Sequence, residues 1–381
     1  MLVFAWFYLP FVGGAELFLR AITERLRDRF DFVIVTGRLR RSLPAVESVA
    51  GATIVRVGVG AALDKFLYLA AAPLRAFRLG RFDVVHAVMV SGGAFAAAAY
   101  LKARPRPSLL TLQDGDSEEY VRRYLGPLFR AYAPLHRRFD RVHAISSYLA
   151  ARALRYGVRP ETVTVIPNGC DPHLFDDPPS AEEQATLRRA LGLEGTRVVV
   201  SVSRLVLKNG LDRLLQAFPA VVAAVPEAAL LLVGEGEDRA ALERQAELLG
   251  IAARVRFAGA VPHADVASYL RLGEVFARPS LSEGLGTAFL EAMACGLPVV
   301  GTRTGGIPDF LADGRTGLFC DPARPETIAE AIVRLLRDPA LAGALGQAGR
   351  TLVSERYRWE AVAAKIAATY EELLTAPAAR P

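Results

Sequence analysis

Cysteine is scarce in this chain: Cys170, Cys295 and Cys320 are the only three in 381 residues, and none share the short spacing of metal ligands. A sparse, odd-numbered set argues against a disulfide framework and favours a reducing compartment such as the cytoplasm. The five histidines also lack ligand spacing, so the sequence predicts no zinc site. The first residues do not show the basic, apolar and small-residue pattern of a secretory signal, so we expect none.

Long uninterrupted apolar runs are missing as well. Residues 84–101 reach the minimum length of a membrane span, but they contain His86 and a Ser-Gly-Gly break. A buried strand followed by a buried helix explains this segment better than a membrane helix does. Residues 1–19 are interrupted by Pro10 and two glycines, which favours a strand and a turn.

Charge is present in both signs but is unevenly distributed. Residues 1–176 contain 24 basic and 15 acidic side chains, a net charge of +9, whereas residues 177–381 have a net charge of −3. We therefore expect the first half to meet something anionic, such as phosphates or a membrane surface. Nucleic acid is not expected as a partner, because no basic run interleaved with aromatic residues occurs.

The length predicts two domains, because 381 residues exceed one ordinary core. Short runs rich in Val, Ile and Leu alternate with helical stretches in both halves, as in FDVVHAVMV and RVVVSVSRL. This pattern predicts two α/β domains with doubly wound, Rossmann-like parallel sheets facing a central cleft. A linker rich in Pro and Asp divides residues 1–176 from residues 177–356. We expect a helix at about 357–375 to pack back on the first domain.

The most informative stretch is SEGLGTAFLEAMACG, which begins at residue 282. It places Glu283 in a glycine-containing loop after a strand and Glu291 in the helix that follows. Carboxylates form strong, directional hydrogen bonds to sugar and ribose hydroxyls. The amides at the start of this helix favour phosphate. The neighbours of Glu291 are apolar, so an ordinary solvent-exposed helix charge is a poor explanation for it.

Two other loops also contain residues suited to binding a ligand. In SVSRLVLKNGLDRLL, Arg204 ends a strand and Lys208 lies in the loop before the next helix, so both suit a diphosphate. A structural ion pair is an equal alternative for either cation taken alone. In YLPFVGGAELF, Gly13 and Gly14 form a loop that allows close approach of a ligand to the backbone.

Together with VTVIPNGCD and GEGEDRAALE, these stretches resemble the retaining, GT-B-fold glycosyltransferases of family 4 over essentially the whole chain. The most specific part is the Glu-x7-Glu signature formed by Glu283 and Glu291. The resemblance implies that Glu283 contacts the donor sugar and that Arg204 and Lys208 hold the diphosphate, as the catalytic set. It assigns the ribose hydroxyls to Glu291. The other donor-binding candidates are Gly284, Leu285, Gly286, Thr287, Gly13 and Gly14.

The resemblance implies transfer of a sugar from a UDP- or GDP-sugar to a hydroxyl of a lipid-linked or glycan acceptor, without a metal or other cofactor. Such a reaction belongs to glycolipid or polysaccharide biosynthesis. Two alternatives stay open: a sugar-nucleotide epimerase of the same shape, and a non-catalytic protein that binds sugar nucleotides or polysaccharides. The basic, apolar segments 63–82 and 127–141 predict peripheral contact with the inner face of an anionic membrane. Ordinary packing of these helices on the sheet explains them equally well.

The chain departs from the family pattern in two places. Many members have lysine directly before the loop glycine, where this chain has Asn209. Many also have histidine in a Thr-x-His-Gly pattern, where this chain has Gln113, which can bind a hydroxyl but cannot act as a base. Asp114 and Asp116 match a three-residue metal motif of the other glycosyltransferase fold, yet we predict no metal there. The candidates for the acceptor side are Gln113, Asp114, Asp116 and His86, although a satisfied core histidine explains His86 equally well.

Overall fold

The computed structural model describes residues 1–11, 13–171 and 173–375. They form two compact units: Met1–Gly169 together with the segment from Trp359 onward (unit 1), and Cys170–Arg358 (unit 2). The chain thus leaves unit 1 after Gly169 and returns to it after Arg358. The predicted boundaries, at residues 176/177 and 356/357, lie close to these two points. The two ends of unit 2 are joined, because the N–H of Cys170 donates to the carbonyl of Tyr357 at 2.6 Å.

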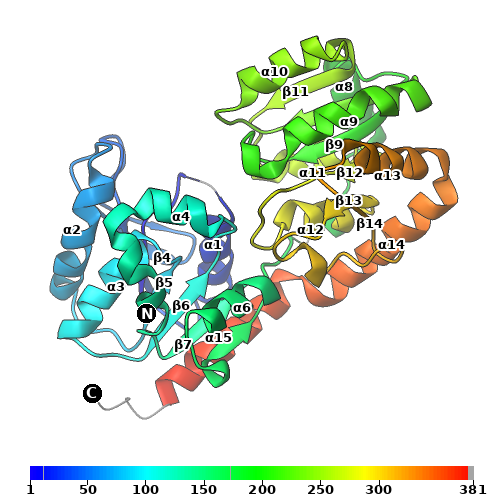
Figure 1. The fold of residues 1–381 in the computed structure, drawn as a ribbon. Coiled ribbons are helices and arrows are strands. Elements are labelled where there is room, and N and C mark those ends of the chain that lie inside the picture. Colours follow the sequence, from blue (N-terminus) through cyan, green and yellow to red (C-terminus); the bar gives the residue numbers. More distant parts are fainter. Residues whose placement is uncertain (12, 172, 376–381) are drawn as a thin grey trace. The chain divides into compact units, whose positions relative to one another are not determined.

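Unit 1 contains an eight-stranded sheet in the order β3-β4-β2-β1-β5-β6-β7-β8 (Figure 1). All neighbouring strands are parallel except the antiparallel pair β3 and β4. Chain order reverses direction between β1 and β5, and such a switch point opens a crevice at the carboxyl ends of the strands. The strands are β1 (Leu2–Ala5), β2 (Phe32–Gly37), β3 (Val46–Val49), β4 (Ala52–Val57), β5 (Val85–Val88), β6 (Ser108–Leu112), β7 (Arg141–Ala144) and β8 (Val163–Val165).

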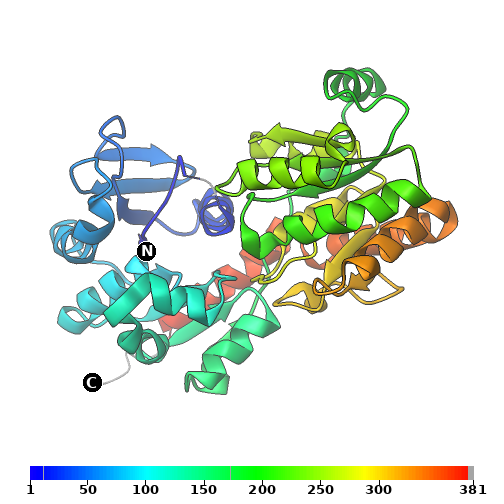
Figure 2. The same cartoon turned by 45° about the horizontal axis from the view of Figure 1, so that its top comes forward.

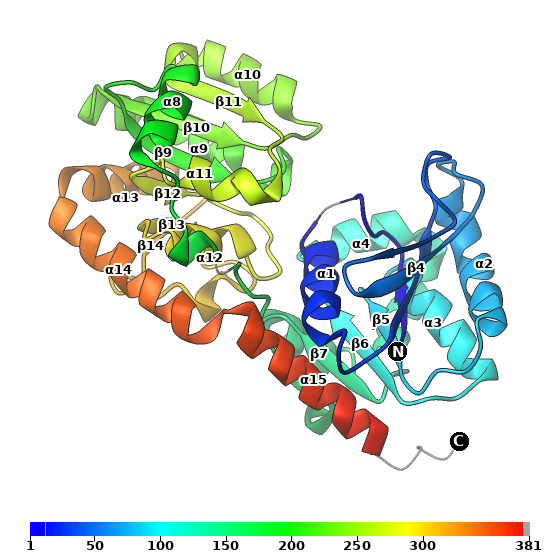
Figure 3. The ribbon, with the colours of Figure 1, turned by 180° about the vertical axis from the view of Figure 1, so that it is seen from behind.

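Helices cover both faces of this sheet, as its apolar strands require. Helices α2 and α3 pack on one face and α1 and α15 on the other (Figures 1 and 3). Residues 84–101 form β5 and most of α3, in agreement with the predicted strand and helix. The helices of unit 1 are α1 (Gly14–Leu26), α2 (Asp64–Arg78), α3 (Gly92–Ala103), α4 (Glu118–Leu125), α5 (Tyr132–His136), α6 (Ser147–Arg155) and α15 (Trp359–Thr375).

The C-terminal helix α15 is part of the core of unit 1 and lies beside α1 (Figure 3). Trp359 and Ile366 pack in one cluster with Phe18 of α1 and with residues of β1 and β2. Gly169 makes room for this contact, because a Cβ atom there would lie 2.6 Å from the indole of Trp359.

A buried chain of hydrogen bonds ties α15 to the sheet. The Tyr370 hydroxyl lies 2.8 Å from His86 Nδ1, and His86 Nε2 lies 2.7 Å from Thr111 Oγ1. Thr111 Oγ1 lies 3.0 Å from His143 Nδ1, and His143 Nε2 donates to the Ile166 carbonyl at 2.7 Å. With both imidazoles neutral and the carbonyl able only to accept, each proton in the chain has one position. Burial lowers the pKa of His86 to about 3 and that of His143 to about 4, which agrees with this arrangement.

Unit 2 contains an all-parallel sheet in the order β11-β10-β9-β12-β13-β14, with its switch point between β9 and β12. The strands are β9 (Arg197–Val202), β10 (Ala228–Val233), β11 (Val255–Gly259), β12 (Val275–Ala277), β13 (Val299–Thr302) and β14 (Leu318–Cys320). The helices are α7 (His173–Asp176), α8 (Ala181–Ala190), α9 (Leu211–Ala224), α10 (Arg239–Leu248), α11 (Val266–Leu270), α12 (Thr287–Ala294), α13 (Pro325–Arg337) and α14 (Pro339–Arg356).

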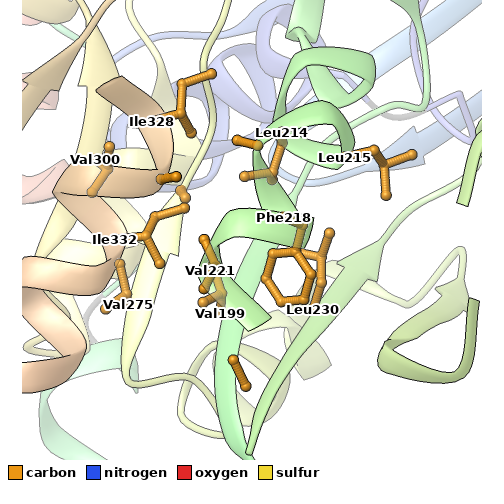
Figure 4. Close-up of a cluster of buried hydrophobic side chains, with 14 of the residues drawn as sticks. Val199, Leu214, Leu215, Phe218, Val221, Leu230, Val275, Val300, Ile328 and Ile332 are labelled. Carbon is orange, nitrogen blue, oxygen red and sulfur yellow. The ribbon is translucent and has the colours of Figure 1, made fainter. Parts of the chain in front are cut away.

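A core cluster of unit 2 lies between this sheet and the neighbouring helices α9 and α13, which lie side by side (Figure 2). Figure 4 shows Val199, Leu230, Val275 and Val300 from the strands, Leu214, Phe218 and Val221 from α9, and Ile328 and Ile332 from α13. The strands are therefore held rigidly behind the loops at their carboxyl ends.

Within the described ranges, no helix is both long enough and apolar enough to cross a membrane. The three cysteines are free thiols.

Candidate active site

The predicted catalytic residues lie in two loops at the switch point of unit 2. Arg204 and Lys208 follow β9, and Glu283 follows β12, and these two strands are parallel neighbours in the sheet. The loops are tied together, because the Lys208 carbonyl accepts from the N–H of Leu281 at 2.8 Å and from that of Ser282 at 3.3 Å. The sequence placed both loops at strand ends, and the sheet order brings them to one place.

Glycines allow these loops to touch. Gly210 has a φ of +67°, and a Cβ atom there would overlap the carbonyl oxygen of Pro279. Gly305, in the loop after β13, has a φ of +57°, and a Cβ atom there would overlap the carbonyl oxygen of Glu283. Side chains at either position would push the loops apart as well as strain the backbone. The backbone of Glu283 is therefore held by loops from three adjacent strands.

Glu283 is also held through its side chain, by an arginine that the sequence analysis did not single out. Arg278 is 5% exposed, and its Nη2 lies 2.6 Å from Glu283 Oε2. The same guanidinium donates to Ser280 Oγ at 3.1 Å and to the Val202 carbonyl at 3.2 Å, and it lies over the ring of Phe289. A buried guanidinium with this many partners has one orientation. It fixes the position of the Glu283 carboxylate, of which 19% stays exposed.

The two predicted diphosphate ligands differ in their surroundings. Arg204 is exposed, and its side chain has no hydrogen-bond or ion-pair partner among the described residues. Lys208 is half-buried in a short 3-10 turn, Leu207–Asn209. Asn209 is buried and donates from Nδ2 to the Arg204 carbonyl at 2.6 Å, so it shapes the loop that carries both cations. Asn209, which stands where many family members have lysine, is therefore held by a hydrogen bond to the backbone of Arg204.

Helix α12 begins directly behind this loop. Its N-cap is Gly286, with a φ of +100°, and none of the described side chains caps the start of the helix. Uncapped amides at a helix start are suited to an anion. Of the predicted donor-binding residues here, Gly284, Leu285 and Gly286 are buried, so their backbone is what a ligand could reach, whereas Thr287 is half-buried.

Glu291 lies further along α12 and is buried, as its apolar neighbours predict, with 7% exposure. Its Oε1 lies 2.9 Å from Nε2 of His263, which belongs to a turn after β11. Its Oε2 has no hydrogen bond to any described residue. Glu291 is therefore oriented through one oxygen.

Sequence reasoning missed Arg278 and His263 for different reasons. The sequence offered a local indication for Arg278, because a charged residue directly follows the apolar strand VFA. It offered no indication for His263, because this residue contacts Glu291 from 28 residues away.

The predicted glycine loop of unit 1 precedes α1. Gly13 is the N-cap of this helix in an extended conformation, and a Cβ atom there would lie 2.7 Å from Glu16 Oε2. A Cβ atom at Gly14 would meet nothing within 4 Å, so this position leaves open space. The assignment of both glycines to the donor stays a prediction.

The acceptor-side candidates need correction. His86 is fully buried between Thr111 and Tyr370, so it cannot reach an acceptor. Gln113 and Asn168 exchange two side-chain hydrogen bonds, at 3.0 and 2.9 Å, so the amide of Gln113 is engaged within unit 1.

The possible metal motif has a different role in the structure. Asp114 is 8% exposed and forms an ion pair with buried Arg152 at 2.7 Å. Asp116 is half-buried beside it, and Ser117, rather than either aspartate, caps α4 by accepting from the Tyr120 N–H. Across the described part of the chain, no three His, Cys, Asp or Glu side chains gather closely enough to hold a metal ion.

Comparison with known proteins matches both units to one family. Residues 183–352 match Glycosyl transferases group 1, and residues 12–174 match Glycosyltransferase Family 4. A protein of Anabaena, HepE, solved in complex with UDP and glucose, aligns with a TM-score of 0.80 at 24% identity, over 97% of this chain and 98% of that one. This likeness establishes the fold.

Two curated relatives are named as sugar-transferring enzymes. The GDP-mannose-dependent alpha-(1-6)-phosphatidylinositol monomannoside mannosyltransferase of Mycolicibacterium smegmatis is 38% identical over 209 residues, 53% of this chain and 54% of the relative. This chain thus matches about half the length of that relative. The D-inositol 3-phosphate glycosyltransferase of Acidothermus cellulolyticus is 30% identical over 396 residues, 95% of this chain and 86% of the relative. The chain therefore belongs to glycosyltransferase family 4, the group 1 glycosyl transferases with the GT-B fold.

Proposed function

We propose that this protein transfers a sugar from a nucleoside diphosphate sugar to a hydroxyl of a lipid-linked or glycan acceptor, with retention of configuration. One observation carries the proposal: Arg278 and three interlocked loops hold the Glu283 carboxylate at the strand ends that also carry Arg204 and Lys208. The names of the relatives support a transferase over the epimerase and the non-catalytic binding protein.

The residues of unit 2 suit the parts of such a donor. Arg204 and the uncapped amides of α12 offer positive charge to a diphosphate. Glu283 offers a fixed carboxylate to a sugar hydroxyl, and Glu291 Oε2 does so to a ribose hydroxyl. Stabilising the departing diphosphate is the main catalytic effect that this set can provide.

The reaction balances without a side-chain base. The bond between the sugar C1 and the diphosphate oxygen breaks, and a bond from C1 to the acceptor oxygen forms on the same face. The acceptor proton goes to the departing phosphate oxygen, so Gln113 is not required as a base.

The test is donor hydrolysis and transfer with a panel of UDP-, GDP- and ADP-sugars. We expect one nucleotide class to be hydrolysed slowly without acceptor and faster with a hydroxyl-bearing acceptor. The anomeric configuration of the product, read by NMR, should match that of the donor. Inversion would overturn the retaining mechanism, and failure to bind or hydrolyse any nucleotide sugar would overturn the transferase assignment.

We further propose that transfer needs no metal ion, because basic side chains and amides hold the diphosphate. Dialysis against EDTA should leave the transfer rate unchanged. Loss of activity with EDTA, followed by recovery with Mn²⁺ or Mg²⁺, would contradict this prediction.

Contact with an anionic membrane is proposed for helix α2. One face of α2 packs in unit 1 through Tyr68, Ala72 and Ala76, which are fully buried. Yet large apolar side chains are also exposed on or beside the same helix: Leu63 at 57%, Phe66 at 62%, Leu67 at 40% and Leu74 at 61%. Basic residues flank them, and a helix of this kind suits the headgroup region of a lipid bilayer. In the second predicted segment, 127–141, Leu128 is 44% exposed, but Tyr132 and Leu135 are buried.

The membrane proposal predicts a lipid-dependent sedimentation. Protein should sediment with phosphatidylcholine vesicles that contain phosphatidylglycerol, less so as salt rises. The double variant Phe66→Ser/Leu74→Ser should bind at least about tenfold more weakly, because two inserted side chains are lost. Leu248→Ser, at an exposed leucine of unit 2, is the matched control and should bind normally. Equal recovery of the wild-type protein in the supernatant with and without phosphatidylglycerol would end the proposal.

A further inference from the structure

The contact between Glu291 and His263 joins two parts of unit 2 that belong to different strands. Glu291 lies in α12, which follows β12, whereas His263 lies in the turn after the edge strand β11. Strands β10 and β9 separate these two strands in the sheet. The short helix α11, which continues the His263 turn, is in contact with α12 (Figure 3). The fold therefore brings an imidazole from the edge of the sheet to the buried carboxylate of α12.

Both residues are carried by backbone that is held in place. The N–H of Asp265 donates to the Pro262 carbonyl at 2.9 Å, and this hydrogen bond closes the turn that contains His263. Helix α11, which follows directly, is anchored by buried residues. Helix α12 is anchored as well, since Leu290, the neighbour of Glu291, is fully buried. The main freedom left to the pair is therefore in the side-chain torsions of Glu291.

The hydrogen bond removes this remaining freedom. An ionised carboxylate can only accept, so His263 Nε2 carries the proton that it shares with Glu291 Oε1, 2.9 Å away. The side chain of Glu291 is 9% exposed and that of His263 is 30% exposed. A hydrogen bond to a carboxylate is strong, and more so where little water competes for it. His263 thus selects one direction of the carboxylate before any ligand arrives.

We infer that His263 is a positioning residue of the donor site, and that it sets how strongly the protein prefers ribose to deoxyribose. It acts through Glu291, by holding Oε1 so that the carboxylate faces the ribose hydroxyls. A carboxylate that is already oriented loses less conformational freedom when it accepts a hydroxyl, so binding is tighter. The inference rests on the proposed function, because the assignment of Glu291 to the ribose gives the pair its role.

The experiment measures the binding of nucleoside diphosphates that have or lack a ribose hydroxyl. The full-length protein is titrated by calorimetry with UDP, GDP and ADP, and then with the 2′-deoxy and 3′-deoxy forms of the one that binds most tightly. We expect the wild type to bind the ribose form at least about tenfold more tightly than one deoxy form, as for one charged hydrogen bond. In His263→Ala this ratio should fall to about threefold or less, because only the ribose form loses affinity.

Three further variants separate positioning from a general loss of structure. His263→Gln keeps an N–H donor near the position of Nε2 and should restore most of the preference for ribose. Asp265→Asn, at an exposed side chain of the same turn, is the matched control and should leave the ratio unchanged. The double variant His263→Ala/Glu291→Gln should have the same ratio as Glu291→Gln alone, because His263 acts only through the carboxylate.

The outcomes distinguish this inference from the proposed function. An unchanged ratio in His263→Ala, whether or not the overall affinity falls, would overturn the inference, because the histidine would then have a structural role alone. If nucleotide sugars are still hydrolysed in that case, the positioning role fails and the transferase proposal stands. If no nucleoside diphosphate binds and no nucleotide sugar is hydrolysed, the proposed function itself fails.

Discussion

Replacing Glu283 by glutamine is expected to lower kcat about a hundredfold or more, the usual loss when one positioned group that stabilises the transition state is removed. The KM for the donor should change much less, because the nucleotide is held by other residues. The shape of the side chain is kept, so the effect reports on charge. Steady-state kinetics with the preferred donor measure both constants, and circular dichroism confirms the fold.

The partner Arg278 makes this experiment sharper. Glu283→Gln leaves a buried guanidinium without its carboxylate, which alone destabilises a protein by about 3–5 kcal/mol. In the double variant Arg278→Met/Glu283→Gln the unpaired charge is gone. If Glu283 serves only the ion pair, the double variant should regain stability and activity together. If Glu283 acts on the sugar, stability returns but kcat stays low.

Glu291→Gln provides the contrast. Loss of a charged hydrogen bond to the ribose should raise the donor KM about tenfold, with little change in kcat. Equal effects of both substitutions on kcat would show that the two glutamates do not divide their roles as proposed.

Acid should destabilise unit 1 strongly, well above the pH at which carboxylates are protonated. His86, His136 and His143 are all 0% exposed, and burial lowers their pKa to about 3, 4 and 4. Histidine in an unfolded chain has a pKa of about 6.5, so between pH 6.5 and 4 the unfolded state binds more protons. Stability therefore falls as pH falls through this window. At pH 5 each histidine contributes a loss of about 2 kcal/mol, or about 6 kcal/mol for the three.

Urea unfolding at pH 7.5 and pH 5.0 measures this loss. His136→Phe removes one titrating ring from an aromatic site beside Tyr132 and Tyr156, and it should recover about a third of the difference. The free energy of unfolding staying constant between the two pH values would contradict the assignment of three neutral buried imidazoles.

The fold could be predicted from the sequence because its strands are short, apolar and bounded by glycine-rich loops. FDVVHAVMV and RVVVSVSRL became β5 and β9. Strand β3 was not predicted, because VESV lies at the edge of the sheet and is mostly exposed, without an apolar pattern. It is recognised as a strand by its antiparallel pairing with β4. The predicted unit boundaries lie close to the observed ones. The hydrogen bond between Cys170 and Tyr357, which joins the two ends of unit 2, is not revealed by local composition.

The site residues could be predicted where they lie close together in the sequence, as Glu283 and Glu291 do. They could not be predicted where a contact joins segments that are far apart in the sequence. His86 looked like a cleft residue because a strand sequence does not say what covers its face. The covering residue is Tyr370, 284 positions later. His263 was missed for the same reason.

The discontinuity of unit 1 has a consequence for biosynthesis. Unit 2 is one continuous segment, so all of its core is available once the ribosome has released Arg358. Unit 1 starts first but must wait, because Ile366, Tyr370 and Leu373 of its core come last. Until then the face of the sheet that α15 covers is open, and His86 lacks the hydroxyl that satisfies it. The first half of the chain to be made is therefore the last to mature, and its sheet exposes apolar surface for longest during synthesis.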